Sequence, residues 1–243
     1  MESKIIGEVG FKFSSRFSQL IGRNLISNPI VAVSELVKNS YDADADNISI
    51  EFSNLLSGVA TLKIIDDGEG MSFEDVATKW MMVGTDNKVH NPITAKGRRK
   101  LGEKGIGRFS VERLAKRLKI ISTKTGDDFA ISFSIDWDQY ETYDGEFSQL
   151  THKVITIPCD VQKKGTTLVL EDLRDNWGKD ELLNLQKELE LLRPIDINKV
   201  SYKKYELPGI NVKINLLAPD ILKSKRFIDS HFIAMHRHIY MER

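Results

Sequence analysis

The chain lacks several features that mark other classes of protein. A single cysteine, Cys159, occurs among 243 residues, which excludes an internal disulfide and a cysteine-built metal site and fits a reducing compartment. The N-terminus has no uninterrupted apolar core of signal-peptide length, and no stretch approaches the length of a membrane span. We therefore expect a cytoplasmic protein with no membrane partner.

A net charge is also lacking. Lys+Arg and Asp+Glu are both 35, so whole-chain charge argues neither for nor against a nucleic-acid partner. We find no internal repeat and no low-complexity tract. What is present is 41% hydrophobic sequence, which is enough for the core of one large domain, or of one domain with a small extension.

Hydrophobic periodicity places helices mainly early and strands mainly later in the chain. Helices are expected after Asn28-Pro29, after the N-cap candidate Ser72, over residues 106–118 and over residues 179–194. Strands are expected over residues 47–52, 60–66, 118–123, 129–137, 152–158, 165–173 and 210–217. This order predicts an α+β fold, with a mostly antiparallel sheet and helices on one face.

The first strong helix carries a polar pair. Glu35 and Asn39 are four residues apart and share a face, and Asp42 follows three residues later. An amide oxygen can coordinate a hard cation such as Mg²⁺, and a carboxylate can orient or deprotonate a water. A solvated helix face with ordinary polar residues explains this segment about equally well.

A second motif, DDGEGM, begins at Asp66 where a strand ends. Its two glycines allow a sharp turn and close approach to a ligand, and an aspartate there can accept a hydrogen bond from the exocyclic amine of adenine. By itself the motif reads more simply as an acidic turn. An EF-hand is excluded, because the regular ligand spacing and the terminal glutamate are absent.

Two further segments could contact phosphate. GEKGIG, residues 102–107, opens a helix, so its backbone N–H groups and Lys104 could hold phosphate oxygens. It is neither a Walker A loop nor the dinucleotide fingerprint. Thr166 could place a hydroxyl near a phosphate, although Gly165-Thr166 alone is only a strand start.

Together the four motifs resemble, in order and approximate spacing, those of the GHKL ATPase superfamily: ELVKNSYDA, DDGEGM, GEKGIGRF and the GTT strand start. This superfamily includes type II topoisomerase ATPase subunits, ninety-kilodalton heat-shock chaperones, MutL and MORC proteins, and histidine kinases. The resemblance covers residues 28–170. It implies a two-layer α/β sandwich of the Bergerat type that binds ATP and Mg²⁺ under a lid at about residues 85–104.

The resemblance also implies a role for each matched position. Glu35 matches the glutamate that activates the attacking water, and Asn39 matches the Mg²⁺ ligand in the nucleotide site. Asp66 matches the adenine-binding aspartate, and Asp67 occupies the variable position. The other matched positions are implied to contact or support the nucleotide: Asp42, Gly68, Gly70, Met71, Gly102, Lys104, Gly105, Gly107 and Thr166.

Glu35 bears on the type of reaction, because histidine kinases usually lack this base. We therefore expect Mg²⁺-dependent ATP hydrolysis, to ADP and phosphate, that drives a conformational switch through a homodimer. The alternative is a nucleotide-binding sensor or histidine-kinase-type module without significant hydrolysis. DNA and a client protein both remain open as further partners. Cations of the lid are expected to lie near the triphosphate: Lys96, Arg98, Arg99, Lys100 and Lys104.

The expected domain is residues 1–194. Residues 195–243 are expected to extend this domain or to begin a truncated following domain. Hydrolytic members of the superfamily complete the site with a lysine from a second domain, and residues 195–243 are too few for one, so slow hydrolysis is expected. ELVKNSYDA looks most like the MutL and MORC motif, whereas GEKGIGRF looks more like bacterial stand-alone ATP-binding proteins. The chain therefore fits no single subfamily.

Overall fold

The computed structural model describes most of the chain: residues 3–10, 12–13, 28–56, 58–83, 92–101, 109–139, 149–160, 163–190, 192 and 211–217. The strands are β1 (Ile5–Gly10), β2 (Lys12–Phe13), β3 (Asn47–Ser53), β4 (Thr61–Asp66), β5 (Met82–Val83), β6 (Ala115–Thr123), β7 (Phe129–Asp136), β8 (Thr151–Pro158), β9 (Gly165–Leu173) and β10 (Asn211–Leu217). The helices are α2 (Pro29–Asp42), α3 (Phe73–Asp75), the π-helix η1 (Val76–Trp80), α5 (Phe109–Leu114) and α7 (Lys179–Glu190).

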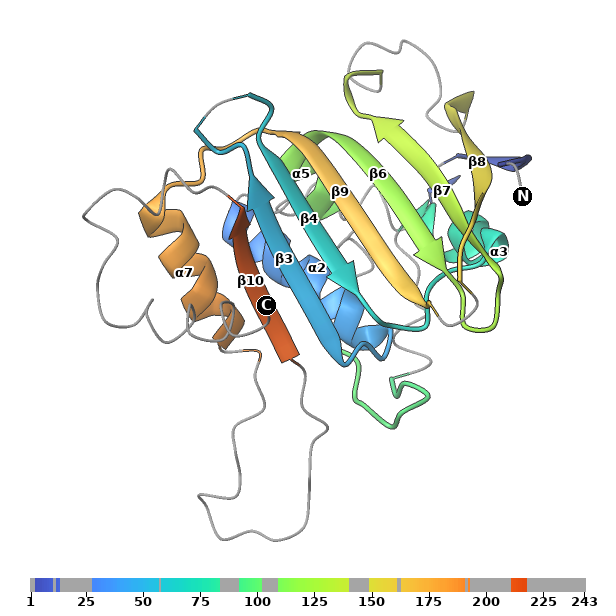
Figure 1. Ribbon diagram of the computed structural model, residues 1–243, viewed down its shortest axis with the longest axis horizontal. Coiled ribbons are helices and arrows are strands. Elements are labelled where there is room, and N and C mark those ends of the chain that lie inside the picture. The colour runs from blue at the N-terminus through green and yellow to red at the C-terminus, as the bar shows by residue number, and fades with distance from the viewer. Residues whose placement is uncertain are drawn as a thin grey trace, which may run out of the picture.

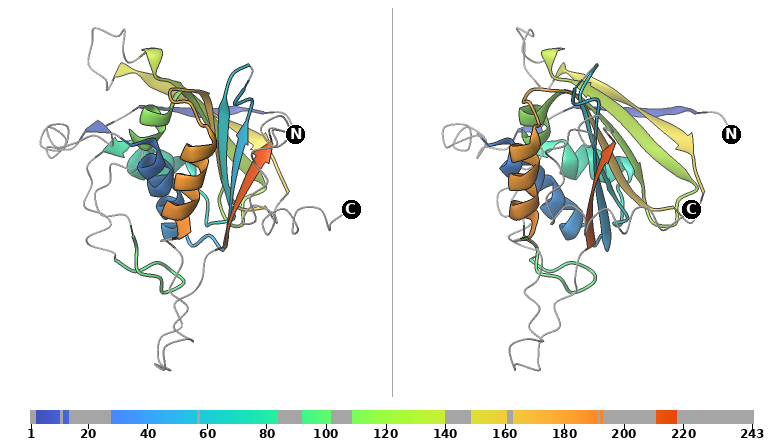
Figure 2. Two further views of the ribbon diagram at one scale, coloured as in Figure 1. Left: turned by 90° about the vertical axis from the view of Figure 1, so that its left-hand side faces the viewer. Right: turned by 60° about the vertical axis from the view of Figure 1, so that its left-hand side comes forward.

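Eight strands form one sheet in the order β1-β8-β7-β6-β9-β4-β3-β10 (Figure 1). Every neighbouring pair is antiparallel except β10 and β3, which run parallel. The short strands β2 and β5 pair separately. The helices cover one face of the large sheet, as Figure 2 shows from two sides. The predicted α+β class and the one-sided helical layer are therefore confirmed.

The core lies between the sheet and its helices. Helix α2 supplies apolar side chains that are almost fully buried, including Val33, Leu36 and Val37, and the sheet supplies Ile50, Leu62 and others. Helix α2 begins at the expected place, because the Asn28 side chain accepts a hydrogen bond from the N–H of Ile30 and Pro29 fits the first turn. It packs against α5 and α7.

Two sequence-based expectations need correction. The helix expected over residues 106–118 ends at Leu114, and Ala115 already begins β6. Strand β6 pairs with both β7 and β9, so inter-strand hydrogen bonds in the middle of the sheet override local helix propensity. Strand β1, which was not expected, forms an edge of the sheet against β8. Within the described ranges, no helix has the length and hydropathy needed to cross a membrane.

Candidate nucleotide-binding site

Asp66 is the last residue of β4, and hydrogen bonds hold its carboxylate from three sides. Its Oδ2 accepts from Ser40 Oγ of α2 at 2.8 Å. Its Oδ1 accepts from the N–H of Gly68 at 3.0 Å and of Thr166 at 3.1 Å. Burial raises the pKa of the Asp66 carboxyl above its usual range, although these three hydrogen bonds favour the charged form. The residue as a whole remains partly exposed to solvent.

Thr166 connects Asp66 to the next strands of the sheet. It lies opposite Asp66 on β4 and opposite Ser122 on β6. Its hydroxyl is 2.9 Å from Ser122 Oγ, which accepts a hydrogen bond from the N–H of Met71 at 2.8 Å. Three of the residues assigned to the nucleotide, Asp66, Met71 and Thr166, therefore belong to one hydrogen-bonded group at the end of the sheet.

The turn over residues 66–70 packs so closely that it requires glycine. Gly70 has φ +68°, and a Cβ there would lie 1.8 Å from the carbonyl oxygen of Thr123. A Cβ on Gly68 would lie 2.7 Å from the carbonyl oxygen of Ala43. Both glycines thus bring the 66–70 turn against protein backbone, a role that the resemblance to nucleotide-binding motifs did not indicate.

Asp67 points away from Asp66 toward the start of β3. Its Oδ1 accepts from the N–H groups of Asp46 and Asn47 at 2.7 and 2.8 Å, and its Oδ2 accepts from Asn47 Nδ2 at 2.7 Å. Burial raises the pKa of this carboxyl, but the hydrogen bonds from Asn47 and Asp46 outweigh it and lower the pKa overall. Asp67 therefore has a structural function at the start of the strand.

Helix α2 carries the other central residues. Glu35 is half-buried, and its Oε1 accepts a hydrogen bond from Lys38 Nζ at 2.7 Å. Asn39 is also half-buried, and it directly precedes Ser40, the residue that contacts Asp66. Asp42 Oδ1 accepts from the N–H of Leu101 at 2.8 Å, directly before the glycine-rich loop. Helix α2 thus contacts both the adenine-binding candidate and Leu101.

The glycine-rich loop itself falls outside the described residues, and so do the predicted contacts of Gly102, Lys104, Gly105 and Gly107. Within the expected lid, residues 92–101 are described. Two of the cations expected near a triphosphate, Lys96 and Arg98, lie in this segment. Both side chains pair with Asp46, and Arg98 is buried. The physical reason is that the acidic residues after α2 lie within reach of the 92–101 segment.

Sequence reasoning missed two residues that support this site, Ser40 and Ser122, and it did not foresee the contacts of Arg98. Ser40 had a usable signal, because it lies four residues after the buried Leu36 on the apolar face of α2. Ser122 and Arg98 had none, because each acts through partners 40 or more residues away in sequence. Such contacts exist only once the sheet and the 92–101 segment are assembled.

Comparison with known proteins places the chain in a family. A family model described as histidine kinase-, DNA gyrase B- and HSP90-like ATPase matches residues 26–166. The chain belongs to this family, and the GHKL assignment made from the motifs is confirmed. ATP binding follows at the level of the family.

The individual relatives share less than a third of their aligned residues with this chain. The chain is 28% identical over 181 residues to the Herpetosiphon aurantiacus protein named "Putative type II restriction enzyme HgiDII", covering 72% of this chain and 28% of the relative. It is 28% identical over 196 residues to the DNA mismatch repair protein MutL of Clostridium beijerinckii, covering 77% and 27% of the two chains. For MutL of Thermodesulfovibrio yellowstonii the identity is 31% over 149 residues, covering 61% and 24%. The chain thus spans about a quarter of the length of these relatives.

Proposed function

We propose that this domain binds ATP with Mg²⁺ and hydrolyses the anhydride bond between the β- and γ-phosphates, so that ADP leaves as water adds to the γ-phosphorus. The observation that carries the proposal is the carboxylate of Asp66, which Ser40, Gly68 and Thr166 hold in place. A carboxylate has about four acceptor positions, so three hydrogen bonds leave one for a further donor. The 6-amino group of adenine is such a donor, and guanine has none at that position.

Asn39 is the residue that we assign to Mg²⁺. It lies on α2 one helical turn from Glu35, and its amide oxygen is a hard ligand of the kind that Mg²⁺ accepts. Mg²⁺ commonly takes one or two protein ligands and completes its octahedron with water and phosphate oxygens. When bound, the ion would neutralise charge that develops on the phosphate.

We therefore expect Asn39→Ala to remove most of the magnesium dependence of ATP binding. Calorimetric titration of ATP with and without Mg²⁺ measures this dependence directly. Asn54→Ala is the matched control, because Asn54 follows β3 and its amide donates to the carbonyl of Val59. A magnesium dependence in Asn39→Ala equal to that of the wild type would contradict the metal assignment.

Glu35 is the residue that we assign to the attacking water. Lys38 holds Oε1, and we assign the water to Oε2, where the carboxylate can accept its proton as the water attacks the γ-phosphorus in line. This assignment favours hydrolysis over the alternative, a sensor or histidine-kinase-type module without significant turnover. Steady-state phosphate release, compared with phosphate transferred to protein, separates the two functions.

The test of catalysis is Glu35→Gln. An interaction that matters only in the transition state lowers kcat and leaves affinity nearly unchanged, so we expect kcat to fall by about 10²–10⁴-fold with ATP binding retained. Glu74→Gln, an exposed change in the first turn of α3, is the control. Lost ATP binding would make Glu35 structural, and undiminished hydrolysis would favour the non-hydrolytic alternative.

We further propose that ATP drives a conformational switch through a homodimer in the full-length protein. The relatives' names support a link to DNA, since they are named as mismatch repair proteins and a restriction enzyme. The present chain spans only about a quarter of each relative's length, so a DNA or client partner is a proposal that the match by itself does not carry over. Sedimentation of the full-length protein with a non-hydrolysable ATP analogue tests the dimer, and an unchanged monomer would contradict it.

A further inference from the structure

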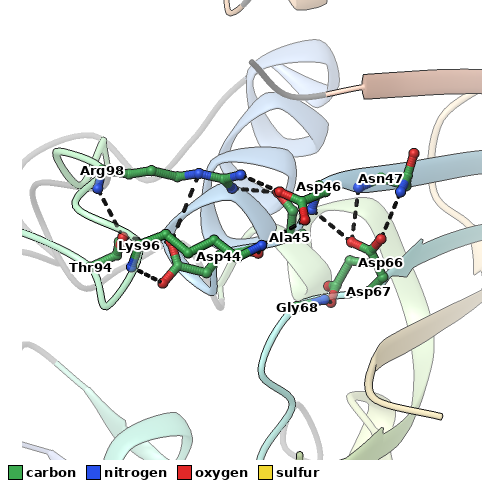
Figure 3. Close-up of polar contacts among 10 residues, drawn as sticks. All are labelled: Asp44, Ala45, Asp46, Asn47, Asp66, Asp67, Gly68, Thr94, Lys96 and Arg98. Atoms are coloured by element: carbon green, nitrogen blue, oxygen red, sulfur yellow. Dashed lines mark hydrogen bonds and ion pairs between the residues drawn. The ribbon is translucent and has the colours of Figure 1, made fainter. Parts of the chain in front are cut away.

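A buried arginine joins the 92–101 segment to the connector between α2 and β3, residues 43–46 (Figure 3). The guanidinium of Arg98 donates to the carbonyl oxygen of Ala45 and to the carboxylate of Asp46. It also lies over the ring of Tyr41, 5.1 Å from the ring centroid, and its Nε is 3.9 Å from Asp44 Oδ1. The Arg98 side chain is 1% exposed, so these contacts take the place of water at Nη1 and Nη2, whereas the buried Nε has no hydrogen-bond partner among the described residues.

Asp44, in the connector, makes further contacts with the 92–101 segment. It is buried and has φ +61°, a left-handed conformation that residues other than glycine adopt only at a cost. Its carboxylate accepts hydrogen bonds from Thr94 Oγ1 and from the N–H of Lys96, at 3.0 Å for the latter. Lys96 Nζ donates to the Asp44 carbonyl at 2.9 Å. A strained residue persists where its surroundings determine its conformation, as these contacts do here.

The opposite side of the connector contacts the turn that carries Asp66. The N–H of Glu69 donates to the carbonyl of Ala43 at 2.8 Å, and the N–H of Asp46 donates to Asp67 Oδ1 at 2.7 Å. Figure 3 shows the connector between Arg98 and Asp67. A shift of the connector would therefore move the 66–70 turn, and with it the hydrogen bonds of the Asp66 carboxylate.

We propose that Arg98 is a positioning residue for the adenine end of the nucleotide site. The inference rests on the proposed function, because it needs ATP to bind at Asp66. Buried ion pairs are often replaceable by apolar side chains without loss of stability, and fixing the register of packed segments is a role for which they are retained. Because Arg98 acts through the connector, its loss weakens the binding of ATP and the binding of ADP by the same factor.

The experiment compares Arg98→Met with Arg117→Met. Arg117 is the matched control, since its side chain is 44% exposed and its Nε lies 3.6 Å from Glu171 Oε2. Calorimetry measures the Kd values for ATP and for ADP, and thermal unfolding measures stability separately. We expect Arg98→Met to weaken both nucleotides by about tenfold with an unchanged ratio, as for residues that act through a neighbouring element, and Arg117→Met to match the wild type.

If Arg98→Met does not fold, a double variant allows the same affinities to be measured. Arg98→Met with Asp44→Asn removes both buried charges, so no carboxylate is left unpaired in the core, yet the bonds to Ala45 and Asp46 stay absent. We expect the double variant to fold and to bind both nucleotides more weakly than the wild type does. Wild-type Kd values in a folded Arg98 variant would overturn the inference and leave Arg98 purely structural.

Two other outcomes also count against the inference. Weaker binding of ATP but not ADP would place the effect of Arg98 on the phosphates and overturn the adenine-end assignment. If the wild-type protein bound neither nucleotide, the proposed function would fail and this inference with it. The failure of the inference alone is therefore distinguishable, because it requires a wild type that binds ATP.

Discussion

Asp66 and Asp67 are adjacent in the chain, yet their carboxylates have different partners. Asp66 contacts Ser40, Gly68 and Thr166 at the end of the sheet, whereas Asp67 contacts the backbone at the start of β3. The directions of their pKa shifts also differ, because burial dominates at Asp66 and hydrogen bonds dominate at Asp67. A conservative change at each residue should therefore affect different properties of the protein.

We expect Asp66→Asn to weaken adenine nucleotides by about 10–100-fold, the effect of one charge-assisted hydrogen bond of about 1.5–3 kcal/mol. Asp67→Asn should leave affinity nearly unchanged, because asparagine Oδ1 can still accept from the N–H groups of Asp46 and Asn47. It should lower the free energy of unfolding by about 1 kcal/mol, since the new amide faces Asn47 Nδ2 and the bond there is lost. Calorimetry and chemical denaturation measure the two effects. Equal losses of affinity would show that Asp66 is not the adenine-binding residue.

The short helix α3 illustrates how an element near the site is held. Ser72 and Asp75 form a reciprocal capping box, and Asp75 Oδ2 also accepts from Lys124 Nζ at 3.0 Å, just after β6. Lys79 pairs with the other carboxylate oxygen. Burial alone would raise the pKa of Asp75, but bonds from Lys79, Ser72 and Lys124 hold it far below its usual range. Asp75 therefore joins α3 to the strand that packs against Gly70.

A group with a lowered pKa stabilises the folded state above its unfolded pKa, and this contribution is lost as pH falls. We therefore expect Asp75→Asn to lower the free energy of unfolding by about 1–2 kcal/mol at pH 7. The difference from the wild type should shrink as pH falls below about 4, where an ordinary aspartate takes up its proton. Urea denaturation at pH 7 and at pH 3 provides the comparison. A difference that stayed constant with pH would contradict the charge-based explanation.

At the scale of the whole molecule, the large sheet extends beyond the region that carries the motifs. Strand β10 pairs in parallel with β3 over seven positions, from Asn211 with Asn47 to Leu217 with Ser53. Figure 1 shows it beside β3 at one edge of the sheet. We therefore propose that β10, residues 211–217, extends the ATP-binding domain, in agreement with the first of the two alternatives expected for the C-terminal region.

We expect a chain that ends at residue 194 to be less stable than one that ends at residue 217. Removal of β10 exposes the hydrogen-bonding edge of β3, and the loss of several inter-strand bonds should cost about 2–5 kcal/mol. Adenine-nucleotide affinity should persist in both, because Ser40, Asp66 and Thr166 precede the deletion. Thermal unfolding of chains 1–194, 1–217 and 1–243 separates loss of β10 from loss of the remaining residues. Equal unfolding temperatures for the first two would contradict the extension.

Local patterns in the sequence were sufficient for most elements. The alternation in residues 129–137 predicts a strand that the structure contains, the strand expected over residues 165–173 is also present, and Asn28-Pro29 predicts the start of α2. These signals are readable because backbone periodicity, capping and proline stereochemistry act within a few residues. The end of α5 and the edge strand β1 depend on pairing with distant strands, and they could not be derived locally.

By itself, the sequence determined the family of this protein, the α+β class and the identity of the motif residues, including Glu35, Asn39 and Asp66. It could do so because the chemistry of nucleotide binding constrains residue type and order along the chain. Only the tertiary structure decided how those residues are held. It assigned Ser40 and Thr166 to Asp66, turned Asp67 toward β3, and buried the Arg98 side chain, which pairs with the exposed carboxylate of Asp46. The physical reason is that each of these contacts joins segments about 20 to 100 residues apart, whose approach is set by the packing of the whole sheet against α2.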